Sequence, residues 1–304
     1  MRIIDAHAHV LERIAGFGPR GELRPIGGGK ARWADGSEIS MIPEEMGSCD
    51  FTGEALLALM DSFQVEKAVL LQGSFYGFQN EYTFETVEKY PERFIGAGTF
   101  DPFCAERDRL LERLLCSFGF RIIKFEISSG GGLMGYHEPF SLNGPLFAPV
   151  ISRIADSGAT LVLDIGSPGM KSYQPEAVKT IADRYPAMKI VLCHLLAPGV
   201  HDLEAMTEGL KMLKRDNIWF DLAAVPWNLE PDPYETAGKF VKTAKGIVGA
   251  EKLIWGTDVP SVLTKERYAD LISYLADSHF LSQPELEAVF YHNACAAYPI
   301  NVGN

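Results

Sequence analysis

The chain has 304 residues and a formal net charge of -12, with 28 Lys and Arg against 40 Asp and Glu. This acidic balance argues against a nucleic-acid partner, because phosphate binding needs clustered basic side chains. The longest apolar runs fall short of the roughly eighteen residues that a membrane-spanning helix needs, so we expect no membrane association.

Cysteine usage and the first residues point to one compartment. The five cysteines are odd in number, scattered and never in a Cys-x-x-Cys pair, which is typical of reduced thiols. Asp5 stands where a signal peptide would need an apolar stretch. We therefore expect a cytoplasmic protein.

Short apolar runs alternate with longer amphipathic segments along the chain. Eight runs have the nearly continuous apolar sequence of parallel strands buried on both faces: 2–10, 67–73, 94–100, 120–126, 160–166, 188–195, 217–223 and 252–258. Helical patterns occupy 52–64, 82–90, 106–118, 147–157, 174–185, 202–215, 234–248 and 265–276. This alternation predicts a single α/β domain over 1–304, a closed (β/α)₈ TIM-type barrel rather than an open doubly wound sheet.

Two segments fall outside the alternation. Residues 11–50 are rich in Gly and Pro, and they form either a lid-like insertion over the barrel mouth or a disordered loop. Their basic residues are either solvated or recruit a carboxylate-bearing substrate. These residues are Arg13, Arg20, Arg24, Lys30 and Arg32. A last amphipathic segment, 284–297, predicts an extra C-terminal helix outside the barrel.

The first predicted strand carries the strongest chemical signal. It ends in Asp5-Ala6-His7-Ala8-His9, and alternate residues of a strand share a face, so both imidazoles point the same way. Neutral imidazole is a common ligand of zinc and neighbouring metals. Because the carboxyl ends of the strands form the active-site face of such a barrel, His7 and His9 predict a site for one divalent metal ion there.

Polar side chains also stand at the ends of later strands. They are Lys124, Glu126, Asp164, His194, Asp221 and Asp258. Asp258 would be a helix cap in the simplest interpretation, but the next helix begins only well after Val259-Pro260, which favours a role in the site. Asp221 either reaches the site or pairs with a lysine of the barrel.

Five segments, which extend over nearly the full length, carry a resemblance to a known family: 5–9, 68–76, 93–102, 190–194 and 255–260. Together they resemble the amidohydrolase superfamily, and within it the amidohydrolase-2 family, which is related to aminocarboxymuconate-semialdehyde decarboxylase-like and dicarboxylate lactonase-like enzymes. The resemblance implies that His7 and His9 bind the metal and that Asp258 is both a ligand and a catalytic proton carrier. It also implies that His194 is catalytic and polarises the substrate or orients water.

One position departs from the family pattern. Many relatives end the fifth strand in a metal-binding histidine, whereas this chain has Asp164. That carboxylate is a further ligand, a group that orients a ligand histidine, or a sign of a degraded metal site. Glu126 is likewise a candidate ligand. The expected cofactor is one divalent ion, zinc first and manganese as the alternative.

The remaining candidates concern the substrate. Lys124 either holds a substrate carboxylate or forms a buried salt bridge with Glu126. Further candidate substrate contacts are Gln72, Ser74, Tyr76 and Trp227. We expect a homodimer that acts on a small carboxylate-bearing molecule. Three functions remain open: a metal-dependent hydrolase of a lactone, ester or amide; a non-oxidative decarboxylase of an aromatic or muconate-type acid; and a non-catalytic ligand-binding barrel.

Overall fold

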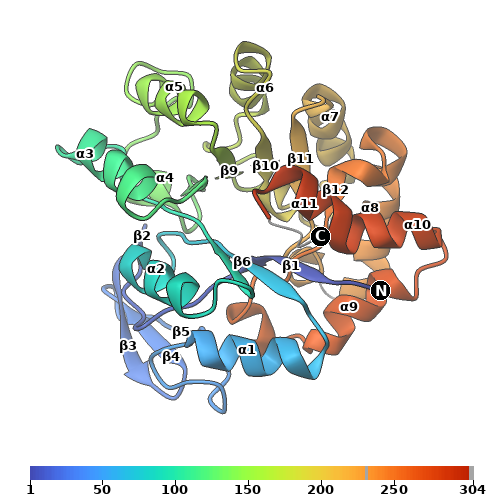
Figure 1. Ribbon diagram of the computed structural model, residues 1–304, viewed down its shortest axis with the longest axis horizontal. Coiled ribbons are helices and arrows are strands. Elements are labelled where there is room, and N and C mark those ends of the chain that lie inside the picture. The colour runs from blue at the N-terminus through green and yellow to red at the C-terminus, as the bar shows by residue number, and fades with distance from the viewer. Residues whose placement is uncertain (230–231, 301–304) are drawn as a thin grey trace.

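The computed structural model describes residues 1–229 and 232–300. Eight parallel strands form its centre (Figure 1): β1 (Ile4–Ala8), β6 (Lys67–Leu70), β7 (Phe94–Gly96), β8 (Ile122–Glu126), β9 (Thr160–Asp164), β10 (Ile190–Leu192), β11 (Ile218–Asp221) and β12 (Leu253–Ile254). Parallel bridges Gly98↔Ile123 and Ala8↔Val259 join the β1-β6-β7 sheet to the β8–β12 sheet at both edges. The strands thus close into a barrel, which confirms the predicted fold.

Helices connect successive strands and surround the barrel, as Figure 1 shows. They are α1 (Gly53–Ser62), α2 (Asn80–Lys89), α3 (Arg107–Glu112), α5 (Ala148–Ser157), α6 (Pro175–Arg184), α7 (Leu203–Leu213), α8 (Pro233–Val248) and α9 (Tyr268–Ala276). Each overlaps a segment with a predicted helical pattern, although α2 and α8 begin before the predicted start. A short helix that the sequence pattern missed, α4 (Leu133–Tyr136), lies in the loop after β8. Among the described residues, no helix is long and apolar enough to cross the hydrocarbon layer of a membrane.

The C-terminal helical segment closes one end of the barrel. It consists of α10 (Gln283–Glu287), a π-helical turn (Ala288–His292) and α11 (Asn293–Ala297). Its residues Tyr291 and Ala294 pack in one buried cluster with Ile4 and Val69, which come from the strands. The helix is therefore present as predicted. Its expected position against the outside of the barrel is wrong, because its apolar face covers the barrel interior at the end where the strands begin.

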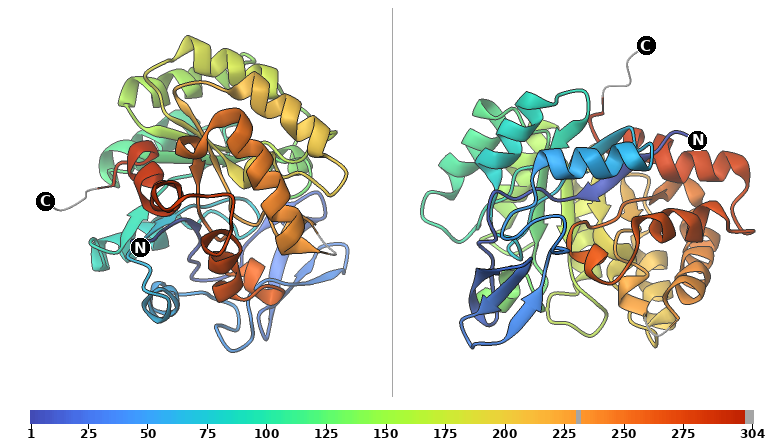
Figure 2. Two further views of the ribbon diagram at one scale, coloured as in Figure 1. Left: turned by 90° about the vertical axis from the view of Figure 1, so that its right-hand side faces the viewer. Right: turned by 90° about the horizontal axis from the view of Figure 1, so that it is seen from below.

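Residues 11–50 form an antiparallel sheet rather than an irregular loop. Its strands are β2 (Phe17–Gly18), β3 (Gly21–Gly27), β4 (Lys30–Trp33) and β5 (Glu38–Ser40), paired in that order. Figure 2 shows this sheet at the end of the molecule opposite to the two termini. Its strands escaped prediction because they are short and the turns between them are built from glycine.

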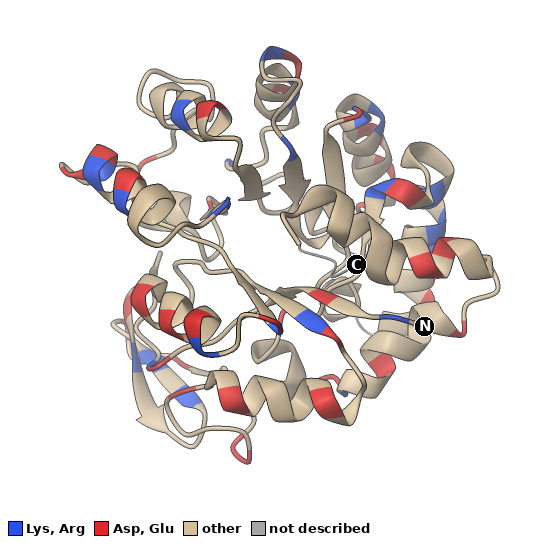
Figure 3. Cartoon of the chain, viewed as in Figure 1, with Lys and Arg blue, Asp and Glu red and all other residues tan. Residues whose placement is uncertain are grey.

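Two of the five basic residues of this insertion have partners within it. Arg32 forms an ion pair with Glu38, with an Nη2–Oε1 distance of 2.6 Å. Arg20 donates to the Ser37 hydroxyl at 3.1 Å. Acidic and basic residues also lie near each other on several outer helices, whereas α1 carries acidic residues alone (Figure 3). Arg20 and Arg32 thus pair within the insertion, and recruitment of a substrate carboxylate by its basic residues stays a prediction.

Candidate active site

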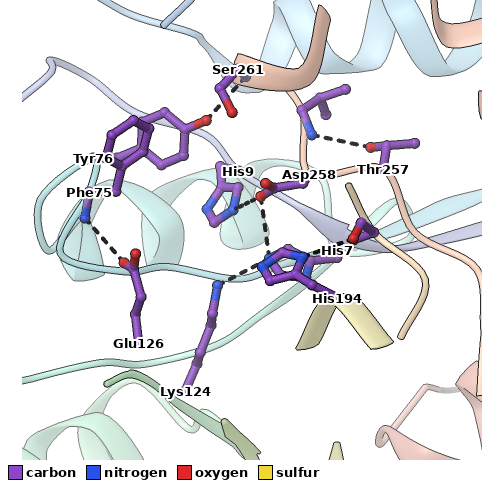
Figure 4. Close-up of polar contacts among 12 residues, drawn as sticks. His7, His9, Phe75, Tyr76, Lys124, Glu126, His194, Thr257, Asp258 and Ser261 are labelled. Carbon is purple, nitrogen blue, oxygen red and sulfur yellow. Dashed lines mark hydrogen bonds and ion pairs between the residues drawn. The ribbon is translucent and has the colours of Figure 1, made fainter. Parts of the chain in front are cut away.

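The His-x-His pair lies at the carboxyl end of β1, and both rings are buried. The Nδ1 atom of His7 is 2.9 Å from Oδ2 of Asp221, so Nδ1 carries the hydrogen and donates it to the carboxylate. The Nε2 atom is then left with its lone pair. Figure 4 shows His7, His9 and Asp258 grouped together. Nε2 of His9 is 2.8 Å from Oδ1 of Asp258, and Nε2 of His7 is 3.5 Å from the same oxygen.

These three side chains form a candidate metal centre. One ligand atom of each lies within 4.8 Å of the others. Burial lowers the pKa of both His7 and His9, which keeps the rings neutral. Burial raises the pKa of Asp258, but the hydrogen bond with His9 and the electrostatic effect of the surrounding imidazoles outweigh it and hold this pKa below its usual range. Neutral imidazole and ionised carboxylate are the forms that bind divalent cations, so the donor set fits such an ion.

A second buried carboxylate ties the two strands that carry this centre. Asp5 accepts hydrogen bonds from Thr257 N at 3.0 Å, from Thr257 Oγ1 at 2.6 Å and from the Tyr268 hydroxyl at 3.0 Å. Asp258, the residue after Thr257, donates its N–H to the carbonyl of His7 at 2.7 Å. Asp5 therefore fixes the segment that follows β12 against β1, directly beside His7 and Asp258.

Replacing Asp5 with Ala is expected to lower the free energy of unfolding by about 3 kcal/mol, because the buried donors of Thr257 and Tyr268 lose their acceptor. Urea unfolding of metal-free protein measures this change. Asp156→Asn, at an exposed position on α5, is the matched control. A loss for Asp5→Ala no larger than that of the control would show that the network contributes little.

Lys124 and Glu126 share a face of β8, but they have different partners. Nζ of Lys124 donates to Nε2 of His7 at 3.0 Å. Burial lowers the pKa of this lysine, but the acidic groups around it, Cys193 first and then Glu126, raise it overall. Among the ion pairs of the described residues, none joins Lys124 to Glu126, so the alternative of a salt bridge between them is wrong.

Glu126 instead faces the loop after β6. Its Oε2 accepts hydrogen bonds from Phe75 N at 3.2 Å and from Ser74 Oγ at 3.3 Å. Burial and the neighbouring Asp164 raise the pKa of Glu126 to about 7.

Asp164 ends β9 and lies in register with Glu126 on β8. Its Oδ1 accepts the N–H of Gly166 at 2.8 Å, and among the hydrogen bonds of the described residues it has none to a histidine. The interpretation that Asp164 orients a ligand histidine is therefore wrong. In the described part of the chain, the clustered ligand atoms around His7 include neither Asp164 nor Glu126.

His194 lies in a 3₁₀ turn, Cys193–Leu196, directly after β10. The turn has positive φ from His194 to Ala197, a left-handed path that non-glycine residues rarely adopt outside functional sites. The ring stacks on His7 at a centroid distance of 4.9 Å, and Nδ1 lies 2.9 Å from the carbonyl oxygen of Ala223, to which it donates. Burial lowers the pKa of His194, but the charges of Asp258 and other carboxylates outweigh it and raise this pKa overall.

Asp221 is the site residue whose role the sequence left open. Besides binding His7, its Oδ1 accepts the backbone N–H of His194 at 2.7 Å. It is completely buried and belongs to the site rather than to a pair with a lysine. Its only sequence signal was a carboxylate at the end of the seventh strand.

A cavity of about 450 Å³ opens over these residues, a size suited to a small molecule. Its polar lining includes His9, Lys124, Glu126, Asp164, His194, Asp258, Ser40, Ser128, Ser167, Asn228 and Ser261. Ser40 comes from β5, so the insertion contributes to the cavity wall.

The four predicted substrate contacts divide into two pairs. Tyr76 and Trp227 line the cavity, and the Tyr76 hydroxyl accepts the Ser261 N–H at 3.1 Å. Gln72 and Ser74 lie behind the wall: Gln72 donates to the carbonyl of Ala97 at 2.5 Å, and Ser74 donates to Glu126. Substrate contact by Gln72 and Ser74 stays a prediction.

The model of the amidohydrolase family matches residues 4–300. The chain belongs to the amidohydrolase family. Solved structures of similar fold include a probable 2-pyrone-4,6-dicarboxylic acid hydrolase from Acinetobacter baumannii with citric acid bound, which is 17% identical with a TM-score of 0.72 over 99% of this chain and 100% of that one. An amidohydrolase from Burkholderia multivorans with bound zinc is 17% identical, with a TM-score of 0.74 and the same coverage.

A third solved structure superposes less closely and over less of the chain. The 5-carboxyvanillate decarboxylase from Sphingomonas paucimobilis is 19% identical, with a TM-score of 0.56 over 81% of this chain and 82% of that one. The family model confirms the resemblance drawn from the sequence, and the solved structures confirm the barrel. At such identities the structures share a fold with this chain, and the reaction has to be argued from the site.

Proposed function

We propose that this amidohydrolase is a metal-dependent hydrolase that cleaves a lactone, ester or amide of a small substrate with water. The observation that supports this most is the convergence of His7, His9 and Asp258 at the base of the cavity. Two imidazoles and a carboxylate are the three-ligand set of many catalytic zinc sites, so we propose zinc, with manganese as the alternative. A bound ion would polarise the carbonyl and lower the pKa of water.

Asp258 has the position of the general base. Its side chain is 21% exposed and lines the cavity, while the ring of His7 is fully buried beneath it. Its ionised carboxylate accepts the proton of the attacking water and returns it to the leaving group. His194 faces the same cavity, and its raised pKa favours a protonated ring that donates to the carbonyl oxygen as negative charge develops there.

Lys124 is the residue of this cavity that best fits a substrate carboxylate. It is the one Lys or Arg in the described cavity lining. Metal binding at Nε2 of His7 would replace the hydrogen bond from Lys124 and free its ammonium group. We therefore propose a substrate that bears one carboxylate, which would pair with Lys124.

Asp221→Asn is expected to weaken metal affinity about 10- to 100-fold, because the carboxylate fixes the tautomer and orientation of His7. Competition with a metal-binding dye measures the affinity. Asp216→Asn, an exposed position just before β11, is the control. Equal metal affinities of the two variants would show that Asp221 does not contribute to metal binding.

The proposal is tested with metal-free protein to which zinc or manganese is returned. Lactones, esters and amides are assayed for hydrolysis, and aromatic and muconate-type acids for release of carbon dioxide. Metal-dependent hydrolysis supports the proposal. Carbon dioxide release without hydrolysis would assign a decarboxylase instead, and a lack of any turnover with either ion would favour a ligand-binding barrel.

A further inference from the structure

The charge of the cavity differs from what a dicarboxylate requires. Its described lining holds three carboxylates, Glu126, Asp164 and Asp258, and one basic residue, Lys124, with no arginine. Recognition of carboxylates relies on arginine or lysine, and like charges brought together across an interface disfavour binding. One of the similar structures is named for a dicarboxylic acid hydrolase, yet Lys124 is the one Lys or Arg in the described lining of this cavity, and the proposed role of His194 is at the reacting carbonyl.

Glu126 and Asp164 form a pair at the ends of neighbouring strands. They are in register on β8 and β9, and both line the cavity. Each has one oxygen fixed by the backbone, Glu126 by Phe75 N–H and Asp164 by Gly166 N–H. In the hydrogen bonds among the described residues, Oε1 of Glu126 and Oδ2 of Asp164 have no partner, although Asp164 is only 8% exposed.

Neither oxygen is among the fully buried unpartnered atoms of the described residues, so both are open to the cavity and can accept hydrogen bonds from a ligand there. Backbone bonds hold both carboxylates in place, so their free oxygens are preorganised toward the cavity. We propose that Glu126 and Asp164 are specificity residues that accept hydrogen bonds from hydroxyl groups, so that the substrate is a polyhydroxylated lactone or ester rather than a dicarboxylate. This inference rests on the proposed hydrolase function.

Other ligands of this pair are less consistent with the site. An ammonium group would meet Lys124, two positions from Glu126 on the same strand face and in the same cavity. A second metal ion would need a further donor, and the ligand clusters of the described residues leave this pair out. Aromatic lining by Tyr76 and Trp227 suits the C–H faces of a hydroxylated ring.

The test compares substrates on the zinc-loaded enzyme. A set of aldono-1,4-lactones is measured beside γ-butyrolactone, which has the same ring without hydroxyls, homoserine lactone, which adds an amine, and 2-pyrone-4,6-dicarboxylate. At least one aldonolactone is expected to exceed γ-butyrolactone in kcat/KM by about 10²-fold, because its hydroxyls donate to carboxylate oxygens that the plain ring leaves without a donor. Preference for the dicarboxylate or the amine would overturn the inference.

Substitutions of Glu126 and Asp164 then test whether these two residues recognise the hydroxyl groups. Glu126→Gln and Asp164→Asn are each expected to lower the ratio of aldonolactone to γ-butyrolactone kcat/KM about 10-fold or more, while zinc content stays at the value of the unchanged protein. Asp156→Asn, on the outer helix α5, is the control and keeps the ratio. Zinc loss in either variant, or an unchanged ratio, would contradict a role in hydroxyl recognition.

A binding measurement tests hydroxyl recognition independently of the proposed hydrolysis. Calorimetry with Asp258→Asn measures binding of the same lactones whether or not hydrolysis occurs. Binding of an aldonolactone that is lost when Glu126→Gln is added supports recognition even if the reaction proves to be another. If no aldonolactone binds to either Asp258→Asn or the unchanged protein, while the enzyme still hydrolyses another ester, the inference about hydroxyl recognition is overturned and the proposed hydrolase function stands.

Discussion

Asp258→Asn is expected to lower kcat by about 10³- to 10⁴-fold, the upper part of the range for loss of a general base. The amide cannot take the proton of the attacking water, and the low pKa of the native carboxylate means that it is ionised and ready to do so at neutral pH. Steady-state hydrolysis of the best substrate measures the effect. KM is expected to change much less than kcat, because the lost interaction belongs to the transition state.

The control for this substitution is Asp277→Asn, an exposed Asp-to-Asn change just after α9. Zinc content is measured on both variants, since Asp258 is also a proposed ligand. Retained zinc with lost turnover separates the proton-transfer role from metal binding. A kcat within about threefold of the control would rule out Asp258 as the general base, because even weak general bases contribute about 10²-fold.

Replacing His7 and His9 together with Ala is expected to remove the bound metal and all metal-dependent turnover. Two of three proposed ligands are lost, and a lone carboxylate binds a divalent ion only weakly. Metal analysis after dialysis and the hydrolysis assay measure the two effects. The matched control is the double variant His201→Ala and His279→Ala, which removes two exposed histidines.

Folding has to be kept apart from metal loss in this experiment, because His7→Ala leaves the buried Asp221 carboxylate without its ring partner. His9→Ala alone keeps that contact and serves as the second variant. Thermal unfolding in the presence of a chelator shows whether each variant folds. A folded His9→Ala protein with unchanged zinc and turnover would contradict the proposed ligand set.

Much of the barrel was predictable because each of its strands and helices has a hydrophobic pattern that can be recognised within a short stretch of sequence. Strands buried on both faces are apolar along their length, and amphipathic helices separate them, so both elements leave clear patterns. The short strands of 11–50 leave no such pattern, since two to seven residues between glycine turns give too little periodicity. The position of the C-terminal helix was missed because an apolar helix face does not specify which surface it covers.

The sequence indicated the candidate ligands of the site, but it did not indicate the hydrogen bonds that hold them. His7 and His9 alternate on one strand, and that spacing alone places both rings on one face. The partners of Asp221 and Glu126 depend on how the strands and loops lie beside each other in space. Asp221 reaches His7 from a position 214 residues away in the chain, and Glu126 reaches Phe75 over 51 residues.

Metal stoichiometry measured together with hydrolysis tests the central claim most directly. Chelator-treated protein is titrated with zinc, and bound zinc and the rate of hydrolysis of one lactone are measured in the same samples. The rate of hydrolysis is expected to rise in proportion to bound zinc and to reach its maximum at about one ion per chain, because three protein ligands surround a single catalytic ion. Full hydrolytic activity in protein without metal would contradict it.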